Sequence, residues 1–339
     1  MDSSEAQRRR VPRTTVKSVA VLGCGSIGSR HASNLLSLGY RVIAYDPSTA
    51  SRARFEQQVG SACASDIRQV WDAKPEVCVI ASTPESHVDQ AFQALNSDCH
   101  LLIEKPVSHS LENLPELVNF VHKKCVTGMV CCNMRFHPGI KLVKALVENR
   151  HVGAIIAARL HTGSFLPDWR PWTDYRLGHS VDGARGGGAL LECIHEIDIA
   201  LWLFGPARLS GAATLPTYLE TRNAEGLAEL LLRHDSGVLS SIHLNFVQRD
   251  YQRFYELIGE SGTIYWDFHN SDVVVKRDTS QVEHVRASEN WETNQMYVDE
   301  LTYFFKCIDR QEKPFSTIED GFNALRVALE ARKRAGSVI

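Results

Sequence analysis

The first third of the chain alternates short apolar runs with longer amphipathic segments. Four runs of β-favouring residues, each indicating a buried strand, cover residues 19–22, 41–45, 77–82 and 101–103. Helical periodicity separates them, first up to Gly39 and later over residues 88–95. Strands that alternate with helices predict a doubly wound sheet of parallel strands. In such a sheet, ligands bind beyond the carboxyl ends of the strands.

The pattern changes after residue 138. A helix is expected over residues 139–148, and a strand is expected within residues 152–165. Five further strands are expected over residues 228–233, 237–247, 255–259, 263–268 and 272–276. Short turns between several of them predict a largely antiparallel sheet. Helices over residues 294–310 and 318–334 are expected to end the chain.

Composition and charge narrow the functions that such a chain can have. The net charge is −3, which argues against a nucleic-acid partner because such a surface needs a basic excess. No stretch approaches the apolar length needed to cross a bilayer, so no membrane partner is expected. The polar start of the chain lacks the apolar core of a signal peptide. Nine cysteines, an odd number without C-x-x-C spacing, favour a reducing, cytoplasmic setting.

A dinucleotide-binding motif follows the first strand. The run Gly23-Cys24-Gly25-Ser26-Ile27-Gly28 is a full G-x-G-x-x-G between a strand and a helix. Gly23 permits the turn, Gly25 lets a pyrophosphate approach the backbone, and Gly28 lets the helix pack closely. The amides of Ser26 and Ile27 at the helix start would face the phosphates.

The second strand ends on Asp46, 18 residues after Gly28 (46 − 28). A carboxylate there accepts hydrogen bonds from the adenosine ribose and repels a 2′-phosphate, which favours NAD over NADP. Arg52 and Arg54 leave NADP open, since either side chain could reach a phosphate.

These features divide the chain into a flexible tail over residues 1–15, a Rossmann dinucleotide-binding domain over residues 16–136, and a second domain over residues 137–339. With 339 residues, the chain can bury two cores. The expected fold class is α/β, with an N-terminal Rossmann domain and a C-terminal α+β domain that contains a large, mostly antiparallel open sheet.

Six sequence pieces in order resemble the Gfo/Idh/MocA family of NAD(P)-dependent oxidoreductases. They are "VLGCGSIGSRH", "ASTPESHVDQA", "LLIEKPVS", "NMRFHPGIK", "GGGALLECIHEID" and "YELIGESGTIYWD". The resemblance implies that the cofactor is lined by Thr83, Pro84, His87, Glu104, Lys105 and Asn133. It implies that Glu104 and Lys105 lie beside the nicotinamide and that Arg135 approaches the substrate. It also implies a second domain that binds substrate and uses its open sheet to form a homodimer or homotetramer.

The segment "FLPDWRPWTDYRLGHSVDGARGGG" is rich in aromatic residues and arginine. A packed surface loop accounts for such a composition, since aromatic side chains anchor loops. A sugar-binding platform accounts for it as well, because aromatic faces stack on C–H groups and arginines bind hydroxyl or anionic groups. The candidate substrate contacts are Trp169, Arg170, Trp172, Tyr175 and Arg176.

Residues 187–205 resemble one apolar helix that contains Glu192, His195, Glu196 and Asp198. A solvated outer face is one interpretation, but Leu191, Ile199 and Trp202 lie between the charges, which favours a buried helix with a polar notch. The donor set does not favour zinc, since H-E-x-x-H is missing, and no metal is expected.

The chemistry best matched to these residues is hydride transfer between nicotinamide and a secondary alcohol or ketone of a sugar, sugar derivative or cyclitol. His195 is the candidate base because imidazole titrates at about 6.5. Asp198 or Glu192, at i+3 and i−3, is expected to orient it. Lys105 is expected to stabilise the alkoxide, although a lysine in a turn is usually only a surface residue. A non-catalytic dinucleotide-binding regulator and a reductase of a non-sugar carbonyl are the alternatives.

Overall fold

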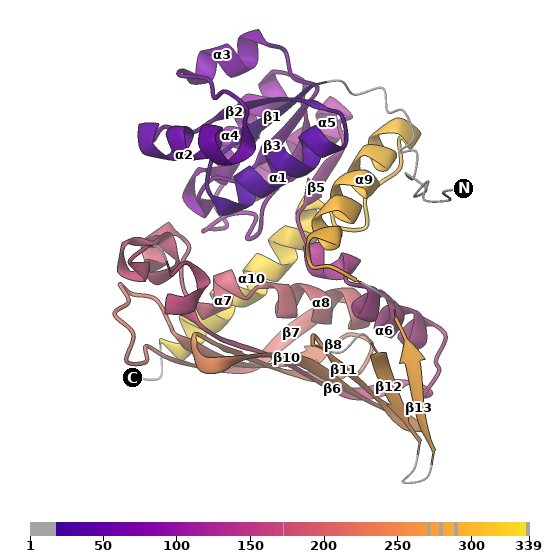
Figure 1. Ribbon diagram of the computed structural model, residues 1–339. Coiled ribbons are helices and arrows are strands. Elements are labelled where there is room, and N and C mark those ends of the chain that lie inside the picture. Colours follow the sequence, from indigo (N-terminus) through magenta and orange to yellow (C-terminus); the bar gives the residue numbers. More distant parts are fainter. Residues whose placement is uncertain (1–17, 172, 270–271, 278–280, 288–290, 337–339) are drawn as a thin grey trace, which may run out of the picture.

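A computed structural model describes residues 18–171, 173–269, 272–277, 281–287 and 291–336. The predicted tail over residues 1–15 and the candidate Trp172 lie outside the described residues. Two sheets and their covering helices make up the molecule (Figure 1).

The first sheet has five parallel strands in the order β2-β1-β3-β4-β5. Their bounds are β1 Ser18–Leu22, β2 Arg41–Tyr45, β3 Val77–Ile80, β4 His100–Ile103 and β5 Gly128–Val130. The connecting helices are α1 Ser26–Ser37, α2 Thr49–Val59, α3 Ile67–Asp72, α4 His87–Asn96 and α5 Leu114–Lys124. β1 and β3 are buried along their whole length, as expected of central strands in a parallel sheet. The predicted parallel sheet is confirmed.

The second sheet has eight strands in the order β13-β12-β11-β10-β6-β9-β8-β7. Only the β6–β9 pair is parallel among its described pairs. The strands are β6 Ile155–Phe165, β7 Ala207–Leu215, β8 Leu227–His234, β9 Leu239–Asn245, β10 Val247–Gly259, β11 Gly262–Asp267, β12 Asp272–Lys276 and β13 Val282–Arg286. The mostly antiparallel sheet predicted for this half is also confirmed.

Helices cover one face of the second sheet, and the opposite face carries no helix in the described part of the chain (Figure 1). The helices of this half are α6 Pro138–Glu148, α7 Ala189–Glu192, α8 His195–Phe204 and α10 Ile318–Ala335, whereas α9 Asn294–Arg310 packs against α1 of the first half (Figure 1). Short 3-10 helices span Pro84–Ser86, Asn133–Phe136, Leu166–Trp169, Tyr175–Leu177, His179–Val181 and Gly183–Arg185. α10 contacts β5 and α5 of the first sheet layer and β7, α7 and α8 of the second, so it ties the two halves together.

The sequence patterns missed β5, β7 and β13. β5 has only three residues, too few to show a period of two. The register of β7 shifts between Leu209 and Gly211, which breaks the period of two by which a strand is recognised. β13 is mostly exposed on both faces, so it has no apolar alternation. β10 is one continuous strand of 13 residues, whereas only its last five residues were predicted as a separate strand.

No described helix has both the length and the apolar character needed to cross a membrane.

Candidate active site

The glycine-rich turn lies where β1 meets α1. Gly23 has a φ of +100°, and a Cβ there would come within 2.5 Å of the Ala81 carbonyl oxygen. A Cβ at Gly28 would overlap the Gly23 carbonyl oxygen, so both positions require glycine. A Cβ at Gly25 would meet nothing within 4 Å. Gly25 therefore faces open space at the N-terminus of α1, where a cofactor pyrophosphate fits.

Asp46 follows the end of β2 and is held against the glycine-rich turn. Its Oδ2 accepts from the Cys24 amide at 2.9 Å, and its Oδ1 accepts from the Ser48 amide at 2.8 Å. Arg52 donates from Nη1 to the carbonyl oxygens of Asp46 at 2.6 Å and of Pro47 at 3.3 Å. A carboxylate and a guanidinium thus both lie at the edge where the ribose of a dinucleotide would bind.

The ends of β3 and β4 are joined through His87. Its Nε2 lies 3.1 Å from the Ser82 carbonyl oxygen, and its Nδ1 lies 3.0 Å from that of Pro106. Desolvation lowers the pKa of this buried imidazole. Thr83 and Pro84 begin the short turn before α4. His87 was predicted to line the cofactor. In the structure its two ring nitrogens face backbone carbonyl oxygens of the segments that follow β3 and β4.

Glu104 turns into the core beside Lys105. Its Oε1 lies 2.8 Å from Nε2 of the fully buried His31, and its Oε2 accepts from the Lys105 amide at 3.1 Å. Burial alone would raise the pKa of Glu104, but the His31 contact and the Lys105 charge outweigh it and lower the pKa. The Lys105–Pro106 peptide bond is cis.

Asn133 and Arg135 lie in the short turn after β5. Oδ1 of Asn133 is buried and has no hydrogen-bond partner among the described residues. Arg135 binds Asp198 through Nε at 2.8 Å and Nη2 at 2.5 Å, and it also donates to the Phe315 carbonyl. Arg135 is 2% exposed and does not line the cavity described below, and its contact with substrate stays a prediction.

The segment over residues 187–205 is two helices, not the single helix predicted. α7 ends at Glu192 and α8 begins at His195, with Cys193 and Ile194 between them. Cys193 has ψ of +27°, outside the helical range, which changes the direction of the chain. Because of this break, Glu192 and His195 face a cavity, while Glu196 and Asp198 point into the core.

Lys105 meets Glu192 at the boundary between the two halves. Its Nζ donates to the Glu192 carbonyl at 2.9 Å and lies 3.4 Å from Oε2. Oε1 accepts from Ser180 Oγ at 2.5 Å and lies 3.0 Å from His179 Nε2. Burial alone would raise the pKa of Glu192, but the Lys105 charge and these contacts hold it well below its usual range. No spacing rule in the sequence singled out His179 or Ser180.

His195 has no hydrogen-bond partner among the described residues, and its Nδ1 is buried. Desolvation and the charges of Lys105 and Arg253 hold the pKa of His195 well below its usual range, so the imidazole is neutral at neutral pH. The predicted pairing with an acid is corrected here. Asp198 is engaged by Arg135, and Glu192 by Lys105, so neither orients His195.

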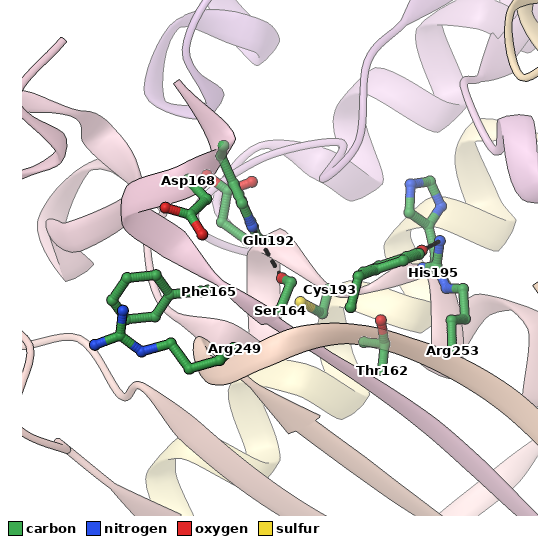
Figure 2. A pocket seen from close by; sticks show the side chains of 11 residues that line it. Thr162, Ser164, Phe165, Asp168, Glu192, Cys193, His195, Arg249 and Arg253 are labelled. Carbon is green, nitrogen blue, oxygen red and sulfur yellow. Dashed lines mark hydrogen bonds between the residues drawn. The ribbon is translucent and has the colours of Figure 1, made fainter. Parts of the chain in front are cut away.

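A cavity of ≈ 460 Å³ opens beside these residues (Figure 2). Its lining comes from β6, the loop after it, the α7–α8 break and β10. The lining residues are Thr162, Ser164, Phe165, Asp168, Trp169, Glu192, Cys193, His195, Arg249, Tyr251 and Arg253.

Of the predicted loop contacts, Trp169 lines this cavity. Its Nε1 donates to Ser164 Oγ at 2.9 Å, which fixes the indole. Three predicted contacts do not line the cavity: Arg170, Tyr175 and Arg176. Arg176 pairs with Asp174 instead, at 2.7 Å.

The sequence reasoning missed the contribution of β10. Arg249, Tyr251 and Arg253 alternate along it and point to one side, a period-of-two signal that was available in the sequence. Nε of Arg253 binds the fully buried Glu196 at 2.6 Å. Glu196, the acid in α8 for which the sequence suggested no partner, is therefore paired with Arg253.

One group of potential metal ligands occurs among the described residues, behind Lys105. Donor atoms of His31, Glu104 and Cys131 lie within 4.8 Å of one another. Without a bound ion, burial raises the pKa of the Cys131 thiol well above its usual value.

Two family models match the chain. The model described as "Oxidoreductase family, NAD-binding Rossmann fold" matches residues 17–131, and the "GFO/IDH/MocA C-terminal domain" model matches residues 140–265. A myo-inositol 2-dehydrogenase of Thermotoga maritima is 24% identical over 93% of this chain and 95% of its own. A scyllo-inositol 2-dehydrogenase (NAD(+)) of Bacillus subtilis is 24% identical over 92% of each chain. A solved levoglucosan dehydrogenase in complex with NADH and levoglucosan superposes with a TM-score of 0.83 at 18% identity, covering 95% of this chain and 97% of that one.

The glycine-rich turn, Asp46 and the parallel sheet define an NAD-binding oxidoreductase, and Lys105, which follows β4 of that sheet, contacts Glu192 in the cavity wall. The chain belongs to the Gfo/Idh/MocA family.

Proposed function

We propose that this protein moves a hydride between NAD and a secondary alcohol or ketone of a sugar, sugar derivative or cyclitol. The observation that carries the proposal is the position of Lys105, whose ammonium contacts Glu192 at the wall of a cavity. The same cavity is lined by a neutral His195 that has no hydrogen-bond partner among the residues described. The names of the relatives, which act on inositols and levoglucosan, support the substrate class.

The residues around the first sheet suit an NAD molecule. The amides of Ser26 and Ile27 at the start of α1 would hold the pyrophosphate, with Gly25 leaving room for it. Asp46 would accept from the adenosine ribose. The unpartnered Oδ1 of Asn133 suits a donor of the cofactor. The bound nicotinamide supplies the hydride acceptor for oxidation and, as NADH, the hydride donor for reduction.

Three side chains then contribute to the transfer of the substrate proton. In oxidation, neutral His195 accepts the proton of the substrate hydroxyl. The ammonium of Lys105 donates a hydrogen bond to the same oxygen and stabilises its developing negative charge. Glu192 accepts from Lys105 and so directs its ammonium, because the Glu192 carboxylate is held ionised by Lys105, His179 and Ser180. In reduction, the imidazolium form of His195 returns the proton to the ketone oxygen.

Variants of the two central residues test this function. Lys105→Ala and His195→Ala are expected to bind NAD but to lose about 100-fold or more in kcat, the usual contribution of a positioned acid or base. NAD binding is measured by calorimetry, and turnover by NADH absorbance with a panel of hexoses and cyclitols. Lys141→Ala removes an exposed lysine of α6 that does not line the cavity, and it serves as the control.

If both variants bind NAD and turn over as fast as the wild type, the assignment of Lys105 and His195 is wrong. If the wild type binds NAD but oxidises no member of the panel and NADH reduces none of the corresponding ketones, a regulatory role replaces the enzymatic one.

We also propose that the open face of the second sheet joins two or four copies of the chain. Partly exposed apolar side chains on that face support it, among them Leu231, Leu239 and Phe254. All nine cysteines are free thiols in the structure, which supports a reducing compartment such as the cytoplasm.

A further inference from the structure

β10 leaves its regular pairing with β6 beside the cavity. Val247 pairs with Phe165 and Gln252 pairs with Gly163, so β10 advances five residues while β6 advances two. Four residues of β10, 248–251, therefore stand opposite the single Ser164 of β6 and form a short arch. Irregularities of this kind occur next to active sites, where they redirect side chains.

The arch is held by its own hydrogen bonds. Oδ1 of the buried Asn245 accepts from the amides of Val247 at 3.0 Å and Gln248 at 2.9 Å. Oε1 of Gln248 accepts from Asn245 Nδ2 at 3.2 Å and lies 3.1 Å from His161 Nε2. The backbone that carries Arg249 is therefore fixed before any ligand binds.

Arg249 brings a cationic side chain to the cavity, which the carboxylate of Asp168 also lines. Its guanidinium lies over the Phe165 ring, 3.7 Å from the ring centre, and it makes no ion pair within the described part of the chain. The other cations at the cavity are compensated, since Arg253 binds Glu196 and Lys105 binds Glu192. Figure 2 shows Arg249 and Phe165 at the end of the cavity away from His195.

We propose that the substrate carries an anionic oxygen group, a carboxylate or a phosphate, that Arg249 binds at the end of the cavity opposite the reacting carbon. The inference rests on the proposed function and names the substrate class for it. Stacking on Phe165 occupies one face of the guanidinium and leaves its in-plane N–H donors free for a bidentate contact. Hydrogen bonds to a charged acceptor are about twice as strong as those to a neutral one, so this site discriminates an acidic sugar from its neutral parent.

Binding to the complex with NADH tests the inference without requiring turnover. The chain saturated with NADH is titrated by calorimetry with glucuronate and galacturonate, with glucose 6-phosphate, and with the neutral parents glucose and galactose. At least one acidic sugar should bind more tightly than its parent. Arg249→Gln should raise the Kd of that acid by about 10- to 100-fold, as expected for a lost charge-assisted contact, and should change the Kd of the parent far less. The uronate and phosphate arms identify which anion fits.

Two further variants sharpen the result. Arg249→Lys keeps the charge but loses the planar fork, so it should recover only part of the preference. Arg326→Gln removes an equal charge from the exposed side of α10 and should change neither Kd. The inference is overturned if no acid binds more tightly than its parent, or if Arg249→Gln weakens both equally. If the chain prefers the acid but turns over no sugar with NAD or NADH, the anion site stands and the enzymatic function is rejected. If the chain turns over neutral sugars and shows no preference for the acid, the enzymatic function stands and the anion site is rejected.

Discussion

Glu196 and Glu300 are both fully buried carboxyl groups, but only Glu196 has a cationic partner. Neither oxygen of Glu300 has a hydrogen-bond partner among the described residues. Burial, together with the charge of Glu104, raises the pKa of Glu300 well above its usual value, so it is a neutral acid at neutral pH. Glu300→Gln keeps that neutral shape and should change the free energy of unfolding by less than about 1 kcal/mol.

The matched variant Glu196→Gln should cost about 3–5 kcal/mol, because it leaves the Arg253 guanidinium buried without its partner. Denaturant unfolding of both variants measures the difference. Equal losses in the two variants would show that Glu300 is ionised in the folded protein.

Glu300 also predicts a pH dependence of stability. Above its unfolded pKa of 4.5, the unfolded chain has released this proton while the folded chain still binds it. A raised pKa in the folded state therefore stabilises the fold at low pH and loses that contribution as the pH rises. The stability of the wild type relative to Glu300→Gln should fall between pH 5 and pH 8, as measured by unfolding at several pH values. A constant difference across that range would contradict the raised pKa.

The pairing of His195 shows where sequence reasoning about single residues ends. The spacing of Asp198 at i+3 predicted a contact within one helix. Both residues lie in α8, but Asp198 binds Arg135 instead, which is 63 positions away in the sequence. Local periodicity contains no information about such a partner. The glycine-rich turn and Lys105 were found because their motifs are contiguous and follow predicted strands.

At the scale of the element, α10 depends on its first turn. Thr317 Oγ1 accepts from the Asp320 amide at 3.1 Å, and Asp320 Oδ2 accepts from the Thr317 amide at 2.7 Å, which forms a capping box. Thr317→Ala removes the cap and should lower the free energy of unfolding by about 1–2 kcal/mol. Thr317→Ser retains the hydroxyl and should lose much less. Equal denaturation midpoints for the wild type and Thr317→Ala would refute this role of the cap.

Elements were predicted best where one period persists. The boundaries of α6, α9 and α10 agree with the sequence to within one residue because each has a continuous apolar stripe. The arch in β10 was not predicted, because it depends on how β10 pairs with β6, and that register is set by contacts distant in the sequence.

For the whole molecule, the alternation of strands and helices predicted the parallel sheet, and strands joined by short turns predicted the antiparallel one. How the two sheets are placed against each other depends on tertiary contacts. Lys105 follows β4 and Glu192 ends α7, and their contact joins segments 87 residues apart. Arg185 adds a second link, since its Nε lies 2.9 Å from Glu85 Oε1. These links bring Lys105 of the first half close to the α7–α8 segment that carries His195, so the candidate site is built from both halves.

The helix-free face of the second sheet leads to a prediction about the oligomeric state. Leu231 on β8 is 38% exposed, and Leu36 on α1 is 37% exposed, so a charge at either site carries the same local cost in the monomer. If copies associate through the sheet, Leu231→Glu places a desolvated charge in the interface and should shift the species seen by size exclusion with light scattering from dimer or tetramer toward monomer. Leu36→Glu should leave the mass unchanged. A wild-type mass that matches one chain, or an equal response of the two variants, would show that this face does not join copies, and another contact would have to cover its apolar side chains.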